Sequence, residues 1–165
     1  MPRAQHKISQ SSQPSQPDGR GQALYEQDFY AWVGEQVEAL RSGHTQGLDI
    51  KNLAEEIEDM GRSQRRAVKS DLIIILSHLL KYRYQPDRRT NSWRASIREH
   101  RRRMRDELAD SPSLRPYSER ILDDCYQDAR EAAADESGLP VVTFPAVCPF
   151  ALEQALDRTF LPEPN

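Results

Sequence analysis

Apolar residues recur along the chain at helical spacing, and one stretch is apolar almost all the way round. Between residues 72 and 80 only Ser77 and His78 are polar. A helix that is apolar on every side has to be buried on every side. Pro86 ends this helix, because the residue before a proline disfavours helical backbone angles. The pattern therefore predicts an all-α fold built around a central helix over residues 63–84.

Amphipathic patterns on either side of the central helix predict the helices that surround it. Their apolar residues return every three or four positions, over residues 24–42, 49–61, 93–109, 112–135 and 149–158. Gly61 weakens a helix by about 1 kcal/mol, and Ser63 can cap a new one. We therefore expect a kink or a short break after residue 61, and a bundle of about five helices overall.

Two segments lack a helical pattern. Residues 1–22 are rich in Ser, Gln and Pro, bury too little apolar surface to offset chain entropy, and are predicted to form a disordered tail. Residues 139–149 hold three prolines and predict an extended loop near the C-terminus, in which residues 141–144 have no partner for a strand. The rest of this chain of 165 residues, residues 23–165, is expected to be a single helical domain.

Several short motifs along the chain resemble a known family. They are LYEQDFYAW at residues 24–32, DIKNLAEEIEDMG at 49–61, HLLK at 78–81, YQP at 84–86, SWRASIR at 92–98, SPSL at 111–114, FP at 144–145 and CP at 148–149. In their order and spacing they resemble the bacterial family known as domain of unknown function twenty-nine, over about residues 24–162. The resemblance implies a small, mainly helical bacterial protein. It implies no activity and no catalytic residues.

The charged residues are distributed unevenly. Residues 81–105 carry ten Lys and Arg against two Asp and Glu, whereas residues 106–165 carry four against thirteen. The two segments can neutralise each other within the fold, or the basic segment can present a patch to an acidic partner. The sequence leaves both arrangements open.

The basic segment contains a row of arginines that suits phosphate groups. Its members lie on one side of the predicted helix 93–109, at spacings of four, three and four: Arg94, Arg98, Arg101 and Arg105. Arginine binds phosphate through paired N–H donors, so nucleic acid or another polyanion is a candidate ligand. Trp93 and Tyr84 can add stacking surfaces, although Trp93 also falls on the apolar stripe of the helix. The competing interpretation is pairing with the acidic C-terminal third.

A second candidate site is acidic. Glu55, Glu56 and Asp59 share one side of a helix, and carboxylate oxygens are the ligands of hard cations such as magnesium. His78, on the most apolar helix, is a candidate general base. If the carboxylates fold back beside His78, the set predicts a divalent-metal-dependent hydrolase. The alternatives are solvated carboxylates and a buried histidine that is simply hydrogen-bonded.

The cysteines and the hydropathy indicate the setting. Cys125 and Cys148 lack the spacing of a metal site and are expected to be free thiols in a reducing compartment. Cys148 could have a lowered pKa at a helix start. Residues 1–22 lack the apolar run of a signal peptide, and no segment reaches the roughly 20 apolar residues of a membrane span. We expect a cytoplasmic protein without a cofactor and without membrane contact.

Three functions remain open at this point. The lack of catalytic motifs and the uneven charge favour a small helical adaptor or regulatory module that binds a protein partner or itself. The first alternative is a nucleic-acid-associated protein that uses the arginine-rich helix 93–105. The second is a metal-dependent hydrolase built on Glu55, Glu56 and Asp59.

Overall fold

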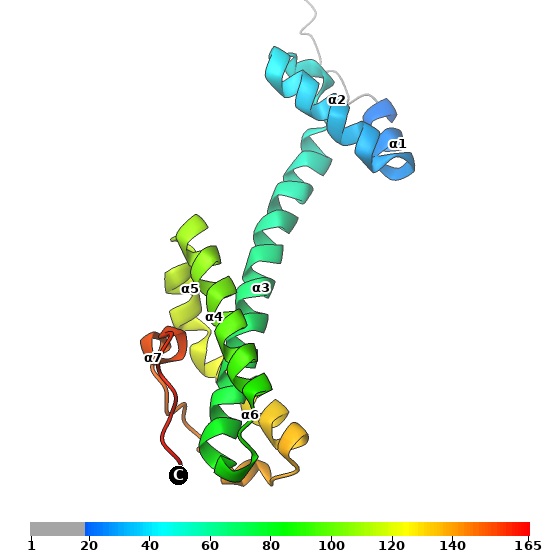
Figure 1. Ribbon diagram of the computed structural model, residues 1–165. Helices are drawn as coiled ribbons and strands as arrows, with labels where there is room; N and C mark the ends of the chain where they lie inside the picture. Colours follow the sequence, from blue (N-terminus) through cyan, green and yellow to red (C-terminus); the bar gives the residue numbers. More distant parts are fainter. Residues whose placement is uncertain (1–18) are drawn as a thin grey trace, which may run out of the picture. The chain divides into compact units, whose positions relative to one another are not determined.

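The structure, a computed structural model, describes residues 19–165, and its regular elements are helices (Figure 1). In chain order they are α1 Gly19–Gln27, α2 Phe29–Ser42, α3 Ile50–Tyr84, α4 Asn91–Asp110, α5 Leu114–Arg120, α6 Leu122–Ser137 and α7 Leu152–Leu156, with short 3-10 turns at Thr45–Gly47, Pro86–Arg88 and Val141–Thr143. The described part of the chain contains no strand, which confirms the all-α fold.

The described helices fall into two compact units, which divide between Asp59 and Met60, and α3 belongs to both. The expected single domain over residues 23–165 stays a prediction. Most of the predicted disordered tail, residues 1–18, lies outside the described residues. Residues 19–22 form the start of α1, so the first helix begins at Gly19 rather than near Leu24.

A cluster of aromatic rings holds the first unit together. Trp32 is buried, with 2% of its surface exposed, and the rings of Tyr25 and Phe29 lie 4.9 and 5.6 Å from it between centroids. Asp28 divides the predicted helix 24–42, because its side chain accepts a hydrogen bond from the Ala31 amide and caps α2 as a new helix. Of the aromatic residues at helical spacing, Trp32 is therefore buried, whereas Phe29 remains 49% exposed.

α3 is a single helix of 35 residues. The expected break after Gly61 is wrong, since the helix continues through Gly61 and Ser63 to Tyr84. One glycine costs a helix about 1 kcal/mol, which the hydrogen-bonded turns on both sides outweigh. The Pro86–Arg88 turn follows after one residue, so the predicted end of the helix is confirmed.

The second unit builds its core around the middle of α3. Leu72, Ile75, Leu76, Leu79 and Leu80 are fully buried, and burying each such side chain contributes about 1.5–3 kcal/mol. They are surrounded by Ile97 and Met104 of α4, Leu114 of α5, Tyr126 and Ala129 of α6, Phe144 and Phe150 of the following loop, and Leu152 and Ala155 of α7. This packing confirms the central apolar helix.

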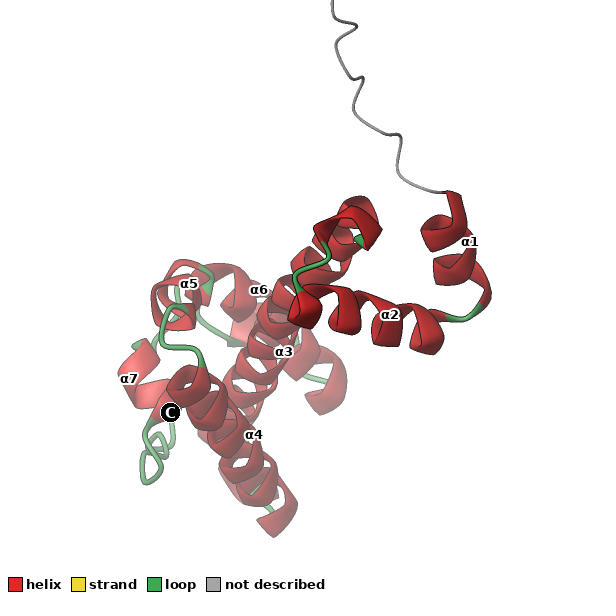
Figure 2. Ribbon diagram, turned by 90° about the horizontal axis from the view of Figure 1, so that it is seen from above, coloured by secondary structure: helices red, strands yellow, loops and turns green. Residues whose placement is uncertain are grey.

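α4 packs antiparallel to α3 (Figures 1 and 2). Near the end of α3, the Lys81 ammonium lies 5.1 Å from the centre of the Trp93 ring at the start of α4. About three turns earlier in α3, Asp71 contacts His100, which lies further along α4. The contacts occur in reversed order along the two helices, as in an antiparallel pair.

α6 packs parallel to α3. Lys69 pairs with Asp128, and Lys81 pairs with Glu136. The two salt bridges follow in the same order along both helices, which gives the parallel direction. α4 and α6 thus both pack along the central helix.

The predicted helix 112–135 is divided at Ile121 into α5 and α6, where φ is −93° and ψ is 0°. Side chains of α6 then hold the Pro-rich segment that follows. The Tyr126 hydroxyl donates to the Pro145 carbonyl at 2.7 Å, and Arg130 Nε donates to the Phe144 carbonyl at 3.1 Å. The extended loop is confirmed, and residues 141–143 form a 3-10 turn instead of a strand.

Two glycines in opposite roles provide a test of these helices. Gly43 has φ +73° and ends α2 in the left-handed conformation, whereas Gly61 lies inside α3 with open space around an added Cβ. We expect Gly43→Ala to lower the free energy of unfolding and Gly61→Ala to raise it, each by roughly 1 kcal/mol. Urea denaturation followed by circular dichroism measures both changes. A loss of stability in Gly61→Ala would contradict a continuous α3.

Candidate anion-binding site

The four arginines that the sequence places on one side of α4 have different environments. Arg94 and Arg98 are exposed and form no salt bridge with any residue that the structure describes. Arg101 is buried. Arg105 is exposed but lies 3.6 Å from the carboxylate of Asp106. The expected row is therefore reduced to Arg94 and Arg98 at its exposed, unpaired end.

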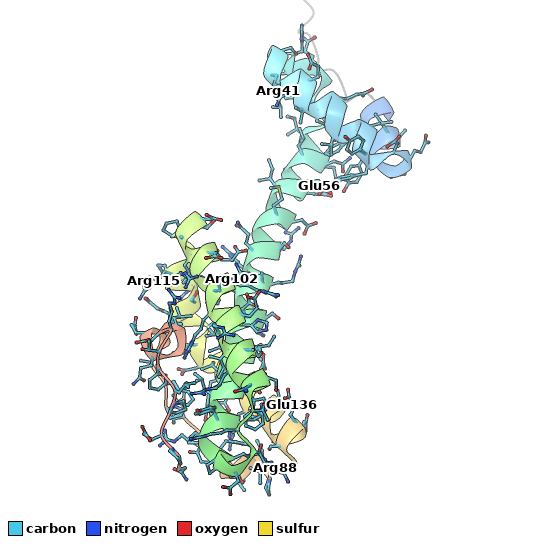
Figure 3. The ribbon with its side chains drawn as sticks, viewed as in Figure 1. Arg41, Glu56, Arg88, Arg102, Arg115 and Glu136 are labelled. Atoms are coloured by element: carbon cyan, nitrogen blue, oxygen red, sulfur yellow. The ribbon has the colours of Figure 1, made fainter. Side chains whose placement is uncertain are left out.

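Other arginines of α4 pair with carboxylates of the same helix. Arg102 binds Glu99 through two nitrogens, at 2.9 and 3.1 Å, and Asp106 through a third contact at 2.7 Å. Arg103 donates to Glu99 at 3.0 Å, and the hydrogen bonds from Arg102 and Arg103 lower the pKa of Glu99 to about 2. The surface around Arg102, labelled in Figure 3, is thus neutralised within the helix.

Two carboxylates that follow α4 in the chain pair with cations outside that helix. Glu136 of α6 pairs with Lys81 of α3, and Glu153 of α7 pairs with Arg115 of α5 at 3.0 Å; Figure 3 labels Glu136 and Arg115. Within the arginine row, Arg101 is acted on by Asp157 of the acidic C-terminal third, whereas Arg94 and Arg98 form no salt bridge with any residue that the structure describes.

Arg101 is 3% exposed and holds the C-terminal segment. Its Nε donates to the Ala155 carbonyl at 2.7 Å, Nη1 to the Phe160 carbonyl at 2.9 Å, and Nη2 to the Gln154 carbonyl at 3.3 Å. Carbonyls at the end of a helix lack partners within it, and a buried guanidinium needs acceptors. Burial lowers the pKa of Arg101 to about 10, so it stays cationic at neutral pH. The prediction that Arg101 is exposed together with Arg94, Arg98 and Arg105 is wrong, because its N–H donors bind backbone carbonyls.

This hydrogen bonding fixes the position of Arg158. Arg101 holds carbonyls on both sides of Arg158 in the chain. Between them, Asp157 accepts a hydrogen bond from the Thr159 amide at 2.7 Å, which stabilises a turn and lowers the pKa of Asp157. Arg158 is exposed on this turn, beside α4.

A pocket of about 350 Å³ lies between α4 and the segment that follows α7. It is lined by Asn91, Arg94, Ala95, Ile97, Arg98, Arg101, Arg158 and Leu161. Arginines from two parts of the chain line it, and their like charges repel one another. An anion bound in the pocket relieves this repulsion and receives paired N–H donors.

Sequence patterns did not indicate Arg158. It lies far beyond α4 in the chain, in an acidic segment, and no local motif links it to Arg94 and Arg98. Arg101 brings Arg158 to Arg94 and Arg98 through its hydrogen bonds to the C-terminal segment. From its helical spacing, Arg101 was predicted to be exposed instead. Only the tertiary contacts identify Arg158 as a member of the group.

The acidic face of α3 in the first unit is not arranged as a metal site. Glu56, labelled in Figure 3, accepts a hydrogen bond from the Tyr25 hydroxyl at 2.6 Å, which raises the pKa of Tyr25 to about 12. Glu55 and Asp59 are exposed. Within residues 19–165, no group of three or more His, Cys, Asp or Glu could hold a metal ion. The described part of the chain therefore does not assemble the expected site, with or without His78.

His78 is half-buried on α3. Its Nδ1 lies 3.0 Å from the Ile74 carbonyl, to which it donates within its own helix. Burial, and then the nearby Lys81 ammonium, lower the pKa of His78, so the neutral imidazole prevails at neutral pH. These contacts match the hydrogen-bonded histidine that was the alternative to a general base.

The two aromatic residues considered for base stacking make contacts inside the second unit. The Trp93 ring packs against Lys81, which is 3% exposed. The Tyr84 ring meets Phe144 edge to face, with centroids 5.4 Å apart. The candidate anion contacts are therefore the arginines alone.

Both cysteines are free thiols with raised pKa values. Burial raises the pKa of Cys125 to about 11, and burial also raises that of Cys148, whose sulfhydryl donates to the Phe150 carbonyl at 3.2 Å. The lowered pKa considered for Cys148 is wrong, because desolvation disfavours the thiolate.

The lowered pKa of His78 predicts a pH dependence of stability. The unfolded chain, with a His pKa of about 6.5, binds the proton more tightly than the folded protein, so the free energy of unfolding falls as the pH drops below about 6.5. His78→Gln removes this titration and keeps a donor for the Ile74 carbonyl. We expect the variant to lose less stability than the natural chain between about pH 7.5 and pH 5, measured by urea denaturation. Equal losses would contradict a depressed pKa.

Comparisons with known proteins agree with the motifs along the chain. No described helix is long and apolar enough to cross a membrane. Neither a curated protein nor a solved structure matches the chain significantly. A family model described as "Domain of unknown function DUF29" matches residues 24–161, a range that includes α4 and the turn carrying Arg158. The chain therefore belongs to the DUF29 family, a family defined as a domain of unknown function.

Proposed function

We propose that the protein binds nucleic acid through the phosphate backbone, with Arg94, Arg98 and Arg158 as the contacting residues. The observation that carries this proposal is the uneven pairing on α4. One side of the helix neutralises its own arginines, and the other leaves them exposed beside a third arginine from the C-terminal segment. Exposed guanidinium groups are well suited to bind phosphate oxygens in pairs. A cytoplasmic setting is part of this proposal.

The spacing of charges along α4 distinguishes two reasons for its many arginines: ion pairs that stabilise the helix surface, and binding of an anionic ligand. Arginines that stabilise a helix surface have carboxylates three or four residues away, as Arg102 and Arg103 have in Glu99. Arg94 and Arg98 have no Asp or Glu at those spacings and are four residues from each other. Like charges at that spacing destabilise a helix slightly. A ligand that neutralises them accounts for an arrangement that helix stability alone disfavours.

Contacts through guanidinium groups predict little sequence preference. Trp93 and Tyr84 pack against Lys81 and Phe144, so they offer little open ring surface for base stacking. Backbone contacts position a nucleic acid without reading its bases. Binding is expected to weaken steeply with salt, because each phosphate contact releases counterions.

Replacing the two exposed arginines of α4 tests the proposal. The double variant Arg94→Gln/Arg98→Gln removes two charges from the pocket side of the helix. We expect it to weaken binding of a labelled single-stranded oligonucleotide by roughly tenfold or more at low salt, and to reduce the slope of log K against log salt concentration by about one to two. Fluorescence anisotropy at several salt concentrations measures both quantities.

The double variant Arg102→Gln/Arg103→Gln is the matched control. It has the same net charge as the first double variant and changes the same helix, but at arginines that already pair with Glu99 and Asp106. We expect its affinity to stay close to that of the natural chain. Equal losses in the two double variants would mean that overall charge decides binding, and no binding by the natural chain at low salt would rule the proposal out.

Association with a second copy of the chain is a second candidate function. It is supported by apolar side chains that the first unit exposes on α3: Ile50 is 62% exposed and Ile57 is 66% exposed. They lie one heptad apart with Leu53 between them, the spacing of a seam between paired helices. Ile57→Glu is expected to convert a dimer into a monomer in sedimentation equilibrium. A natural chain that stays monomeric at every concentration would exclude this candidate.

A further inference from the structure

The pocket beside α4 has the size of a site for one compact group. Its volume of about 350 Å³ is near the lower end of the ligand pockets found in proteins, roughly 300–1,000 Å³. α4 forms one wall, and the segment around Arg158 and Leu161 forms the other. An internal phosphodiester is bonded to a nucleotide on each side, so it is harder to place between two walls. The phosphate at the end of a strand, or on a small molecule, therefore fits between the two walls more easily than an internal phosphodiester does.

The pocket also holds more positive charge than a phosphodiester neutralises. Arg94, Arg98 and Arg158 line it, and the buried Arg101 adds a fourth guanidinium. The carboxylate of Asp157 acts on Arg101 and accepts hydrogen bonds from the turn. A phosphodiester carries one negative charge, whereas a phosphomonoester carries about 1.5–2 at pH 7. The monoester therefore relieves more of the repulsion among the guanidinium groups.

The rest of the lining is neutral or apolar. Ala95, Ile97 and Leu161 contribute apolar surface, and Asn91 contributes an amide. Such surfaces suit the sugar or the base next to a phosphate, because amides supply both a donor and acceptors. The chemistry of the pocket thus fits a phosphate attached to an organic group better than a bare inorganic anion.

We propose that this pocket binds a terminal phosphomonoester, at the end of a nucleic-acid strand or on a mononucleotide, with Arg94, Arg98 and Arg158 as its ligands. The inference rests on the proposed function and narrows it: internal phosphates contact the exposed face of α4, and the terminal phosphate enters the pocket. Arg101 is the positioning residue, because it holds the turn that carries Arg158.

Oligonucleotides of one sequence that differ only at their ends test the inference. Three strands with an internal fluorescent label carry a 5′-phosphate, a 3′-phosphate or no terminal phosphate. We expect a terminal phosphate to tighten binding by roughly tenfold at near-physiological salt, about the effect of one added charge-assisted contact. Arg158→Gln, a change at an exposed residue, removes one of the three proposed contacts. We expect it to weaken binding of all three strands and to abolish the difference between the phosphorylated strands and the unphosphorylated one. Arg102→Gln, at a paired arginine, is expected to keep the gain.

The outcomes separate this inference from the proposed function. Equal affinity for the three strands, with steep salt dependence, overturns terminal-phosphate recognition and leaves backbone binding standing. No binding of any strand at low salt overturns both. A nucleoside monophosphate that displaces the phosphorylated strand supports a free nucleotide as one source of the group, and a gain without such displacement supports the strand end. Inorganic phosphate is the control for simple ionic competition.

The pH dependence of the gain in affinity from a terminal phosphate tests whether the charge of the phosphate causes it. The pKa of Asp157, the carboxylate beside the pocket, is lowered, and guanidinium groups in general do not lose their proton in proteins. A change in the gain between about pH 5.5 and 7.5 therefore reports the charge of the ligand. A phosphomonoester loses its second charge near pH 6. We expect the gain from a terminal phosphate to fall severalfold when the pH is lowered to about 5.5. A constant gain over this range would contradict recognition of the dianion.

Discussion

One buried guanidinium fixes the C-terminal segment of this protein against α4. Arg101 donates to the carbonyls of Gln154, Ala155 and Phe160. A buried charge without acceptors costs several kcal/mol, so the segment cannot leave without exposing or stranding this group. α7 has only five residues, too few to be a stable helix alone. The hydrogen bonds from Arg101, together with the packing of Leu152 and Ala155 in the core, therefore determine where the end of the chain lies.

The same constraint produces the candidate site. Because Arg101 holds the backbone on both sides of Arg158, a surface arginine from the end of the chain is kept beside Arg94 and Arg98. The paired arginines of α4 contribute no such site, since Glu99 and other carboxylates of the helix satisfy them. A helix with many arginines thus offers unpaired charge on one side, where no carboxylate lies three or four residues away. Arg101 adds Arg158 to that side by holding the segment that carries it.

The sequence predicts the fold better than the site. The all-round apolar character of residues 72–80 was enough to identify the central helix, because burial on all sides leaves few other arrangements. Helix boundaries were less predictable: Asp28 divides one helix by capping the next, and Gly61 fails to divide another. For the site, periodicity grouped Arg94, Arg98 and Arg101, which line one pocket, but it could not separate buried from exposed positions. Arg101 and Arg158 depend on tertiary hydrogen bonds that leave no local pattern.

The central claim is that Arg94, Arg98 and Arg158 form one anion site. NMR spectra of the arginine side-chain Nε–H groups, recorded while a 5′-phosphorylated dinucleotide is added to the full chain, test it most directly. The account predicts that the signals of these three residues shift together and saturate with a single Kd, while those of Arg102 and Arg103 stay in place. Shifts of equal size at Arg102 and Arg103, or no shift at Arg158, would contradict it.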